Sequence, residues 1–183
     1  ATIDRFEKYI FSGCNSLREV KIEDGVKVFG IGMFHMCVSL EKVSLPESLI
    51  TIPESAFEDC FSLQNINLPS GLKRIGNSAF DNCQILELFS IPQTVNNIGI
   101  GAFRNCYALK EITIPNGVVG ISDRTFYGAT NLEKVILPED LAYIMERAFY
   151  GCEHIHIKIP QSVRYIAPNA FAQCNNNSYD NLQ

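Results

Sequence analysis

Seven cysteines recur along this chain at an almost constant spacing, and their thiols are the first groups that could do chemistry. They are Cys14, Cys37, Cys60, Cys83, Cys106, Cys152 and Cys174, with Ala129 where the series would place another. On stacked coils, neighbouring thiols would lie about 5 Å apart with parallel side chains, whereas a disulfide holds its Cβ atoms about 3.8 Å apart. We therefore expect buried free thiols that pack as small apolar side chains.

Two histidines are the second candidates for chemistry. His154 and His156 stand beside Glu153, and alternate residues of a strand point to the same face. Two ligands are too few for a zinc site, and His35 has no such neighbour in the sequence, so no metal site is predicted. A Ser-His-Asp set, the H-E-x-x-H motif and the phosphate-binding G-x-x-x-x-G-K-[ST] motif are all missing. The sequence thus predicts neither an enzyme nor a cofactor.

A regular repeat must position all of these side chains, because phenylalanine recurs in step with the cysteines. The evenly spaced series is Phe11, Phe34, Phe57, Phe80, Phe103, Phe126 and Phe149, and Phe171 follows one position early. A period of roughly 20 to 50 residues is typical of a solenoid, whose units bury their apolar faces by stacking. We expect one domain over residues 1–174, with a partial first repeat at 1–14, and a polar C-terminal tail at 175–183.

Each repeat has three parts. The first carries apolar residues two apart, such as Ile66 and Leu68, and predicts a short strand. Pro69 follows, and then apolar residues at three-residue spacing, such as Leu72 and Ile75, which fit a second extended segment or a 3₁₀ turn. The third part, N-S-A-F-D-N-C, has helical spacing. The whole pattern predicts a curved rod of about seven coils.

Composition excludes several classes of partner. The chain of 183 residues has a net charge of -5, with Lys and Arg scattered among Asp and Glu. No basic stripe indicates nucleic acid, and no apolar run approaches the roughly 18 residues of a transmembrane segment. The N-terminal residues lack the apolar region of a signal peptide. What remains for function is the surface of the rod.

The skeleton L-x-x-I-x-I-P-x-x-V-x-x-I-x-x-x-A-F-x-x-C resembles the 23-residue leucine-rich repeats of the BspA-like, or treponemal, class over about residues 3–174. The resemblance implies an α/β leucine-rich repeat solenoid, a right-handed curved stack of short parallel strands with turns and short helical or 3₁₀ segments. It also implies a non-enzymatic bacterial adhesin, extracellular or on the cell surface, that binds host matrix or bacterial surface proteins. A binding protein for a small hydrophobic ligand in an exposed apolar groove, and a scaffold segment of a larger surface protein, are the alternatives.

The outward-pointing strand residues on the concave face are the predicted partner site. They form one ladder of Glu19, Lys42, Asn65, Leu88, Glu111 and Lys134, and a second of Lys21, Ser44, Asn67, Ser90, Thr113 and Ile136. A sheet face that is merely solvated is the alternative interpretation.

A rival aromatic patch uses residues at equivalent places in successive repeats, namely Tyr127 with Tyr150 and Tyr143 with Tyr165. Tyrosine is enriched at binding hot spots, although these rings could equally pack at the rim of the core.

Overall fold

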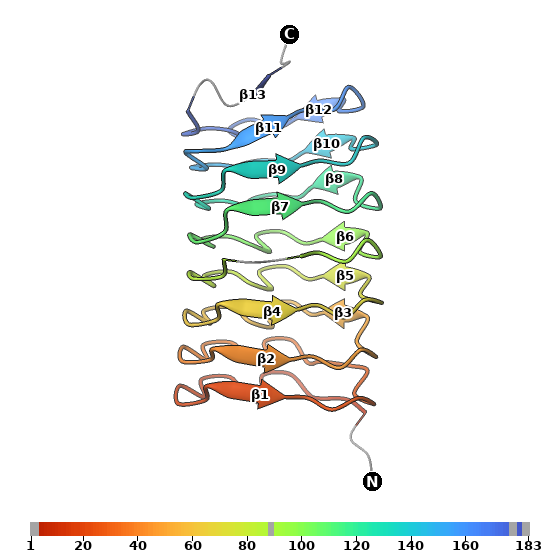
Figure 1. The fold of residues 1–183 in the computed structure, drawn as a ribbon, viewed down its shortest axis with the longest axis vertical. Helices are drawn as coiled ribbons and strands as arrows, with labels where there is room; N and C mark the ends of the chain where they lie inside the picture. Colours follow the sequence, from red (N-terminus) through yellow and green to blue (C-terminus); the bar gives the residue numbers. More distant parts are fainter. Residues whose placement is uncertain (1–3, 88–89, 176–178, 181–183) are drawn as a thin grey trace.

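A computed structural model describes residues 4–87, 90–175 and 179–180 of the chain. Within them, each repeat of the sequence forms one coil, and the coils stack along the long axis of the molecule (Figure 1). The strands of neighbouring coils pair in parallel. The fold is therefore a parallel β-solenoid, in which the chain passes over three sides in every coil.

The first side carries the alternating stretch of each repeat. Six of the seven expected strands are described. The remaining one, the fourth in chain order, includes Leu88 and Phe89, which lie outside the described residues. The strands are β1 (Glu19–Lys21), β2 (Lys42–Ser44), β4 (Asn65–Asn67), β7 (Glu111–Thr113), β9 (Lys134–Ile136) and β11 (His156–Lys158). From β2 onward, the central residue of each is buried and both flanking residues are exposed, as the two-residue period of a strand requires.

The second side carries the segment after the proline. Its strands are β3 (Thr51–Ile52), β5 (Arg74–Ile75), β6 (Asn97–Ile98), β8 (Gly120–Ile121), β10 (Tyr143–Ile144) and β12 (Tyr165–Ile166). They form two sheets of three strands each, in the orders β3-β5-β6 and β12-β10-β8. Of the two conformations that the three-residue spacing allowed, the extended one is confirmed. Proline separates this side from the first because it has no N–H group for a strand ladder.

The third side consists of turns, and no helix is found in the part of the chain that the structure describes. This corrects the expected α/β class and its short helical segments. The residues two before and two after each phenylalanine of the series have positive φ, for example 49° at Ser78 and 59° at Asn82. Such left-handed residues interrupt a right-handed helix. Alternate N–H groups donate instead to the next coil, as from Phe80 N to Ala102 O at 2.8 Å, and those between them donate within the turn, as from Asp81 N to Ser78 O at 3.1 Å.

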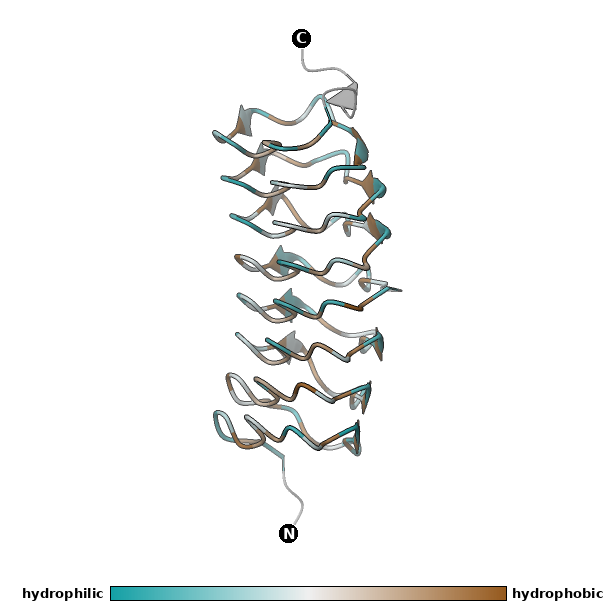
Figure 2. Cartoon of the chain, turned by 90° about the vertical axis from the view of Figure 1, so that its left-hand side faces the viewer, coloured by the Kyte–Doolittle hydropathy of each residue, from teal (hydrophilic) through white to brown (hydrophobic). Residues whose placement is uncertain are grey.

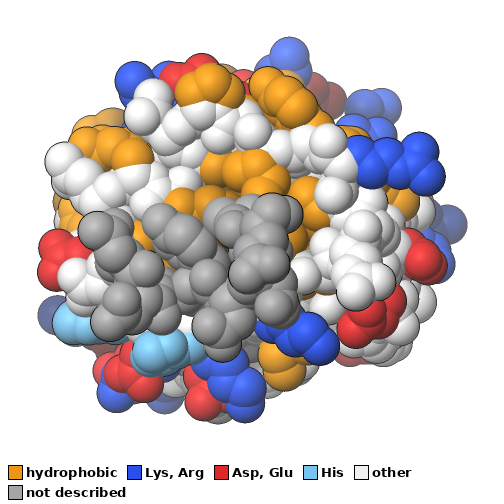
Figure 3. Space-filling view, turned by 90° about the horizontal axis from the view of Figure 1, so that it is seen from above, with side chains coloured by type: hydrophobic (Ala, Val, Ile, Leu, Met, Phe, Trp, Pro, Cys, Tyr) orange, Lys and Arg blue, Asp and Glu red, His pale blue; other side chains and the backbone are white. Residues whose placement is uncertain are grey.

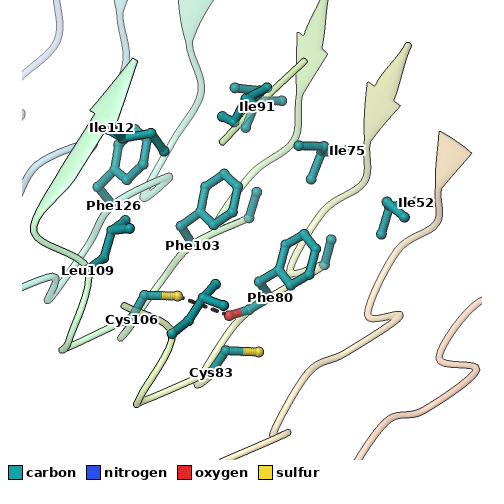
Figure 4. Close-up of a cluster of buried hydrophobic side chains, with 14 of the residues drawn as sticks. Ile52, Ile75, Phe80, Cys83, Ile91, Phe103, Cys106, Leu109, Ile112 and Phe126 are labelled. Carbon is teal, nitrogen blue, oxygen red and sulfur yellow. Dashed lines mark hydrogen bonds between the residues drawn. The ribbon is translucent and has the colours of Figure 1, made fainter. Parts of the chain in front are cut away.

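The phenylalanine series forms a continuous stack through the core. Ring centroids of neighbours from Phe11 to Phe171 lie 5.2 to 5.6 Å apart, at interplanar angles of 2° to 11°. Figure 4 shows the rings beside aliphatic side chains of both strand sides, such as Ile75 and Ile112. Apolar residues recur at the same places of successive coils (Figure 2). The predicted core of the repeat is thus confirmed, and each ring pair contributes about 0.5 to 1.5 kcal/mol beyond its burial.

The C-terminal end differs from a simple polar tail. Within it, β13 (Tyr179–Asp180) pairs in parallel with β11 and extends the first-side sheet. The last coil leaves Val163, Ile166 and Phe171 only partly buried, and apolar side chains are visible when the stack is viewed from this end (Figure 3).

The described residues include no helix that is long and apolar enough to cross a membrane. The handedness and the curvature of the stack stay predictions.

Candidate interaction surface

The outward residues of the first-side strands form a surface, which we call the strand face. It is described on β1, β2 and β4 and on β7, β9 and β11, which belong to two separate sheets. Because alternate residues of a strand point to opposite sides, burying residues such as Val43 and Ile112 forces their neighbours into solvent. Of the twelve predicted residues, Leu88 lies outside the described part of the chain. The other eleven are all exposed, namely Glu19, Lys21, Lys42, Ser44, Asn65, Asn67, Ser90, Glu111, Thr113, Lys134 and Ile136.

The parallel register aligns these residues as predicted. Glu19, Lys42 and Asn65 lie side by side on β1, β2 and β4, and Glu111 lies beside Lys134 on β7 and β9. The same ladder continues to His156 of β11. His156 and Lys158, both exposed, therefore belong to the strand face, although they were not among the predicted residues. The alternation of Ile155, Ile157 and Ile159 is the sequence signal that marks them as outward-facing.

The strand face and its border carry charges of both signs. Lys134 Nζ lies 3.6 Å from Glu111 Oε2 across two strands, and Arg18 Nη1 donates to Glu41 Oε1 at 2.6 Å at the border. These side chains are largely exposed, so each pair contributes only about 0 to 1 kcal/mol to stability. The charges are therefore available to a partner without loss of the fold.

The four predicted tyrosines form two pairs on different elements. Tyr127 and Tyr150 stack in the turns of the third side, with ring centroids 4.9 Å apart and an interplanar angle of 4°. Tyr143 and Tyr165 are register neighbours on β10 and β12 of the second side, and both are exposed. The ring of Tyr143 covers Gly120, where a Cβ atom would collide with it. The rival aromatic patch is thus divided between two sides of the coil.

Tyr127 and Tyr150 belong to a larger row on the third side, which we call the turn-side column. It consists of the residue after each phenylalanine of the series, and its members are Ser12, His35, Glu58, Asp81, Arg104, Tyr127, Tyr150 and Ala172. Inter-coil hydrogen bonds hold the column in register, for example from Asp59 N to Asp81 O at 2.9 Å. Apart from Tyr127 and Tyr150, this row was missed in the sequence, because its members differ in residue type from one repeat to the next. Aligning the repeats and comparing the residue after each phenylalanine would have revealed it.

A buried carboxylate lies in the middle of this column. Asp81 is fully buried, and Arg104 Nη2 approaches its Oδ2 to 2.7 Å. Burial raises the pKa of the Asp81 carboxyl above its ordinary value, and the ion pair with Arg104 opposes that shift. The pair lets a charged group remain inside the coil, because an unpaired buried carboxylate would be strongly unfavourable.

Among the described residues, one group could supply three ligands to a metal ion, and it does not include the two histidines that were considered and set aside in the sequence. The group consists of His35, Glu58 and Asp59, all partly buried. His154 and His156 are exposed and gather no such set within the described part of the chain.

The cysteines are free, as predicted, and all except the exposed Cys14 are buried. Burial raises the pKa of the Cys83 and Cys152 thiols well above their ordinary values, and that of Cys174 to about 11. Because the thiolate is the reactive form, these buried groups are poor nucleophiles and poor metal ligands.

The parallel β-solenoid, with one 23-residue repeat per coil and an exposed strand face, defines a leucine-rich repeat protein. The family described as BspA type Leucine rich repeat region matches residues 1–110 and 97–183, with 6 copies of the repeat. The chain belongs to this family, and the resemblance seen in the sequence is confirmed.

Solved structures of related proteins share the fold. A leucine-rich repeat protein of T. pallidum is 35% identical, with a TM-score of 0.78 over 81% of this chain and 69% of that one. One from Bacteroides ovatus is 27% identical, with a TM-score of 0.71 over 89% of this chain and 48% of that one. A leucine rich cell surface protein of Faecalibacterium prausnitzii is 33% identical, with a TM-score of 0.67 over 93% of this chain and 40% of that one. The chain thus spans less than half the length of the last two. No curated protein matches it.

Proposed function

We propose that this chain is a non-enzymatic interaction module that binds a protein partner through the strand face. The observation that carries the proposal is the contrast between the two faces of the same strands. Among the described residues, the central inward residues of these strands are aliphatic, such as Val43, Ile66 and Ile112. The outward residues differ in charge and polarity from coil to coil. One repeated backbone can therefore present a particular side-chain pattern without a change of fold.

Charge and rigidity both suit the strand face to a protein partner. Lys42 and Lys134 lie in the same ladder as Glu19 and Glu111, so the face offers both signs of charge at fixed spacing. Complementary charges determine which partner binds more than how tightly it binds. The strands are held by backbone hydrogen bonds and a packed core, so little ordering is required on association.

The proposed partner is a host matrix protein or a bacterial surface protein, and the proposed role is that of an adhesin at the cell surface. Membership of the BspA type family supports this role. The likeness to the cell surface protein of Faecalibacterium prausnitzii supports the location. A scaffold segment of a larger surface protein would occupy the same location without a partner of its own.

Charge reversal on the strand face tests the proposal. We expect the double variant Lys42→Glu and Lys134→Glu to weaken saturable binding to immobilised matrix or bacterial surface proteins by tenfold or more in biolayer interferometry. Lys73→Glu is the matched control, because Lys73 is exposed but lies beside β5 on the second side. If the double variant binds as the unchanged protein does while Tyr127→Ala or Tyr150→Ala abolishes binding, the partner site is on the third side.

A second candidate, a site for a small hydrophobic ligand, is favoured by a hollow near the C-terminal end. The hollow has a volume of about 890 Å³. It is lined by apolar residues that include Ile136, Leu137, Ile159, Val163 and Ile166 and by the polar residues Glu139, Lys158, Gln161 and Ser162. This volume is within the range of about 300 to 1,000 Å³ that ligand pockets occupy. Three results together would favour this function over the first. A fluorescent fatty acid should bind the chain, Val163→Asp should remove that binding, and charge reversal at Lys42 and Lys134 should leave it unchanged.

A further inference from the structure

The third side brings together a histidine and two carboxylates that the strand face does not use. One possible ligand atom from each of His35, Glu58 and Asp59 lies within 4.8 Å of the others. His35 Nε2 is 3.9 Å from Asp59 Oδ2, and the two side chains are 26% and 25% exposed. Two ligands of one tetrahedral zinc ion lie roughly 3.4 Å apart, since each metal–ligand distance is about 2.1 Å. Small side-chain rotations would therefore bring these atoms around one ion.

Neighbouring polar groups already hold the other atoms of two of these side chains. Ser12 Oγ lies 3.3 Å from His35 Nδ1, and Asn82 Nδ2 donates to Asp59 Oδ1 at 2.7 Å. When His35 Nδ1–H donates to Ser12, the lone pair of Nε2 faces Asp59 Oδ2. Outer partners of this kind fix the tautomer and the orientation of metal ligands.

Asp81 points to a cation independently of the first three residues. It follows Glu58 in the turn-side column and is 0% exposed; its Oδ2 is paired with Arg104, and its Oδ1 has no hydrogen-bond partner among the described residues. After burial, the charges of Glu58 and Asp59 also raise the pKa of Asp81. Arg104 lies at ion-pair distance from Asp81 Oδ2, yet three carboxylates share this region with that one guanidinium. A bound cation would balance the excess negative charge.

We propose that His35, Glu58 and Asp59 bind a divalent first-row transition metal ion, with Asp81 adding negative charge beside it. Imidazole together with carboxylate suits zinc and its neighbours, whereas calcium and magnesium select sites made only of oxygen. His35 comes from one coil, and Glu58 and Asp59 come from the next. The ion therefore links two coils of the stack, on a different side from the strand face.

Calorimetric titration of the untagged, metal-free chain with ZnCl₂ tests the site, with CaCl₂ in a parallel titration. We expect one Zn²⁺ ion per chain and weak or no calcium binding. His35→Asn and the isosteric Glu58→Gln should each lower zinc affinity more than tenfold. Asn82→Ala, which frees Asp59 Oδ1, should lower it about 10- to 100-fold. His154→Asn is the matched control, because His154 is exposed outside the group, and it should leave affinity unchanged.

Melting curves separate loss of the site from loss of the fold. Zinc should raise the melting temperature of the unchanged chain by mass action, but not that of His35→Asn or Glu58→Gln, both of which should melt cooperatively without metal. The proposal is overturned if Zn²⁺ does not bind saturably, or if both variants bind it as the unchanged chain does. Loss of binding in His154→Asn alone would place the site at His154 and His156 instead. Calcium binding as tight as zinc binding would exclude a transition-metal site.

Discussion

At the scale of single residues, each buried cysteine acts as a small apolar group with one useful donor. Cys83 Sγ donates to Phe57 O at 3.2 Å. Cys106 Sγ donates to Phe80 O at 3.2 Å, and this bond is drawn in Figure 4. Each thiol thus reaches the carbonyl of the phenylalanine in the preceding coil. Burial without disulfides could be predicted from the spacing of the cysteines. The hydrogen bond could not, because donor and acceptor belong to different repeats and meet only through the register of the coils.

Phe80 is the residue at which the contribution of the core to stability can be tested most directly. It is fully buried and stacks on Phe57 at 5.3 Å and Phe103 at 5.5 Å. Phe80→Ala should lower the free energy of unfolding by about 3 to 5 kcal/mol, since it removes both stacks and leaves a cavity. Phe61→Ala is the control, because Phe61 is 39% exposed, and a surface change usually stays within about 0.5 kcal/mol. If urea unfolding shows that Phe80→Ala and Phe61→Ala lose the same free energy of unfolding, the phenylalanine stack is not what stabilises this part of the core.

At the scale of elements, the turns of the third side hold the coils together where strand pairing does not. On the second side, β6 and β8 belong to different sheets. Across the same coils, turn hydrogen bonds continue from Phe103 N to Thr125 O at 2.9 Å and from Asn105 N to Tyr127 O at 2.8 Å. The third side is therefore a structural ladder in its own right.

The strands of the first side could be predicted from the sequence, and the turns of the third side could not. Ile66 and Leu68 are two apart, a spacing that fits a strand and not a helix. Ala79, Phe80 and Cys83, by contrast, have a spacing that fits a helical turn as well as the observed loop. The positive φ that decides between them falls on residues such as Ser55 and Arg124, whose types give no signal for a left-handed conformation. Glycine, which would give that signal, occupies the equivalent position only in some coils, as at Gly32 and Gly101.

The left-handed turns predict a stabilising substitution. Arg124 has a φ of 54° and is exposed, and a side chain in this conformation costs about 1 to 2 kcal/mol. Glycine avoids that cost, but its greater loss of conformational entropy on folding lowers the free energy of unfolding by about 0.5 to 1 kcal/mol. Arg124→Gly should therefore raise the melting temperature by a few degrees. Arg124→Ala, which keeps the Cβ atom, should not; if both variants melt alike, the backbone conformation is not the cause.

At the scale of the whole molecule, the repeat brings together residues that no local pattern connects. The period and the phenylalanine series were sufficient to predict the stack and most of the strand face. The group of His35, Glu58 and Asp59 was missed because His35 has no ligand within its own coil. Finding such a group requires the register between coils, which a reading of the chain in order does not supply.

Thiol labelling measures how cooperatively the stack opens. Burial raises the pKa of the buried thiols, including Cys60, Cys83 and Cys106, so at pH 8 they should react with Ellman's reagent only after unfolding. Of the seven cysteines, we expect Cys14 alone to react quickly in the native protein and all seven in guanidinium chloride. Cys14→Ser should abolish the fast reaction. Two or more fast thiols in the native protein would mean that single coils open independently.

The coils stack along the long axis of the molecule (Figure 1), so the hydrogen bonds between coils run along this axis. This direction has a mechanical consequence. Tension applied to the two ends is carried by one coil boundary after another, so the coils should peel away in sequence. Each coil that is released frees one repeat, or roughly 75 Å of slack at about 3.3 to 3.6 Å per residue. A protein built in this way should lengthen under load before it breaks. In the proposed adhesin role, this lengthening would reduce the peak force on the bound partner.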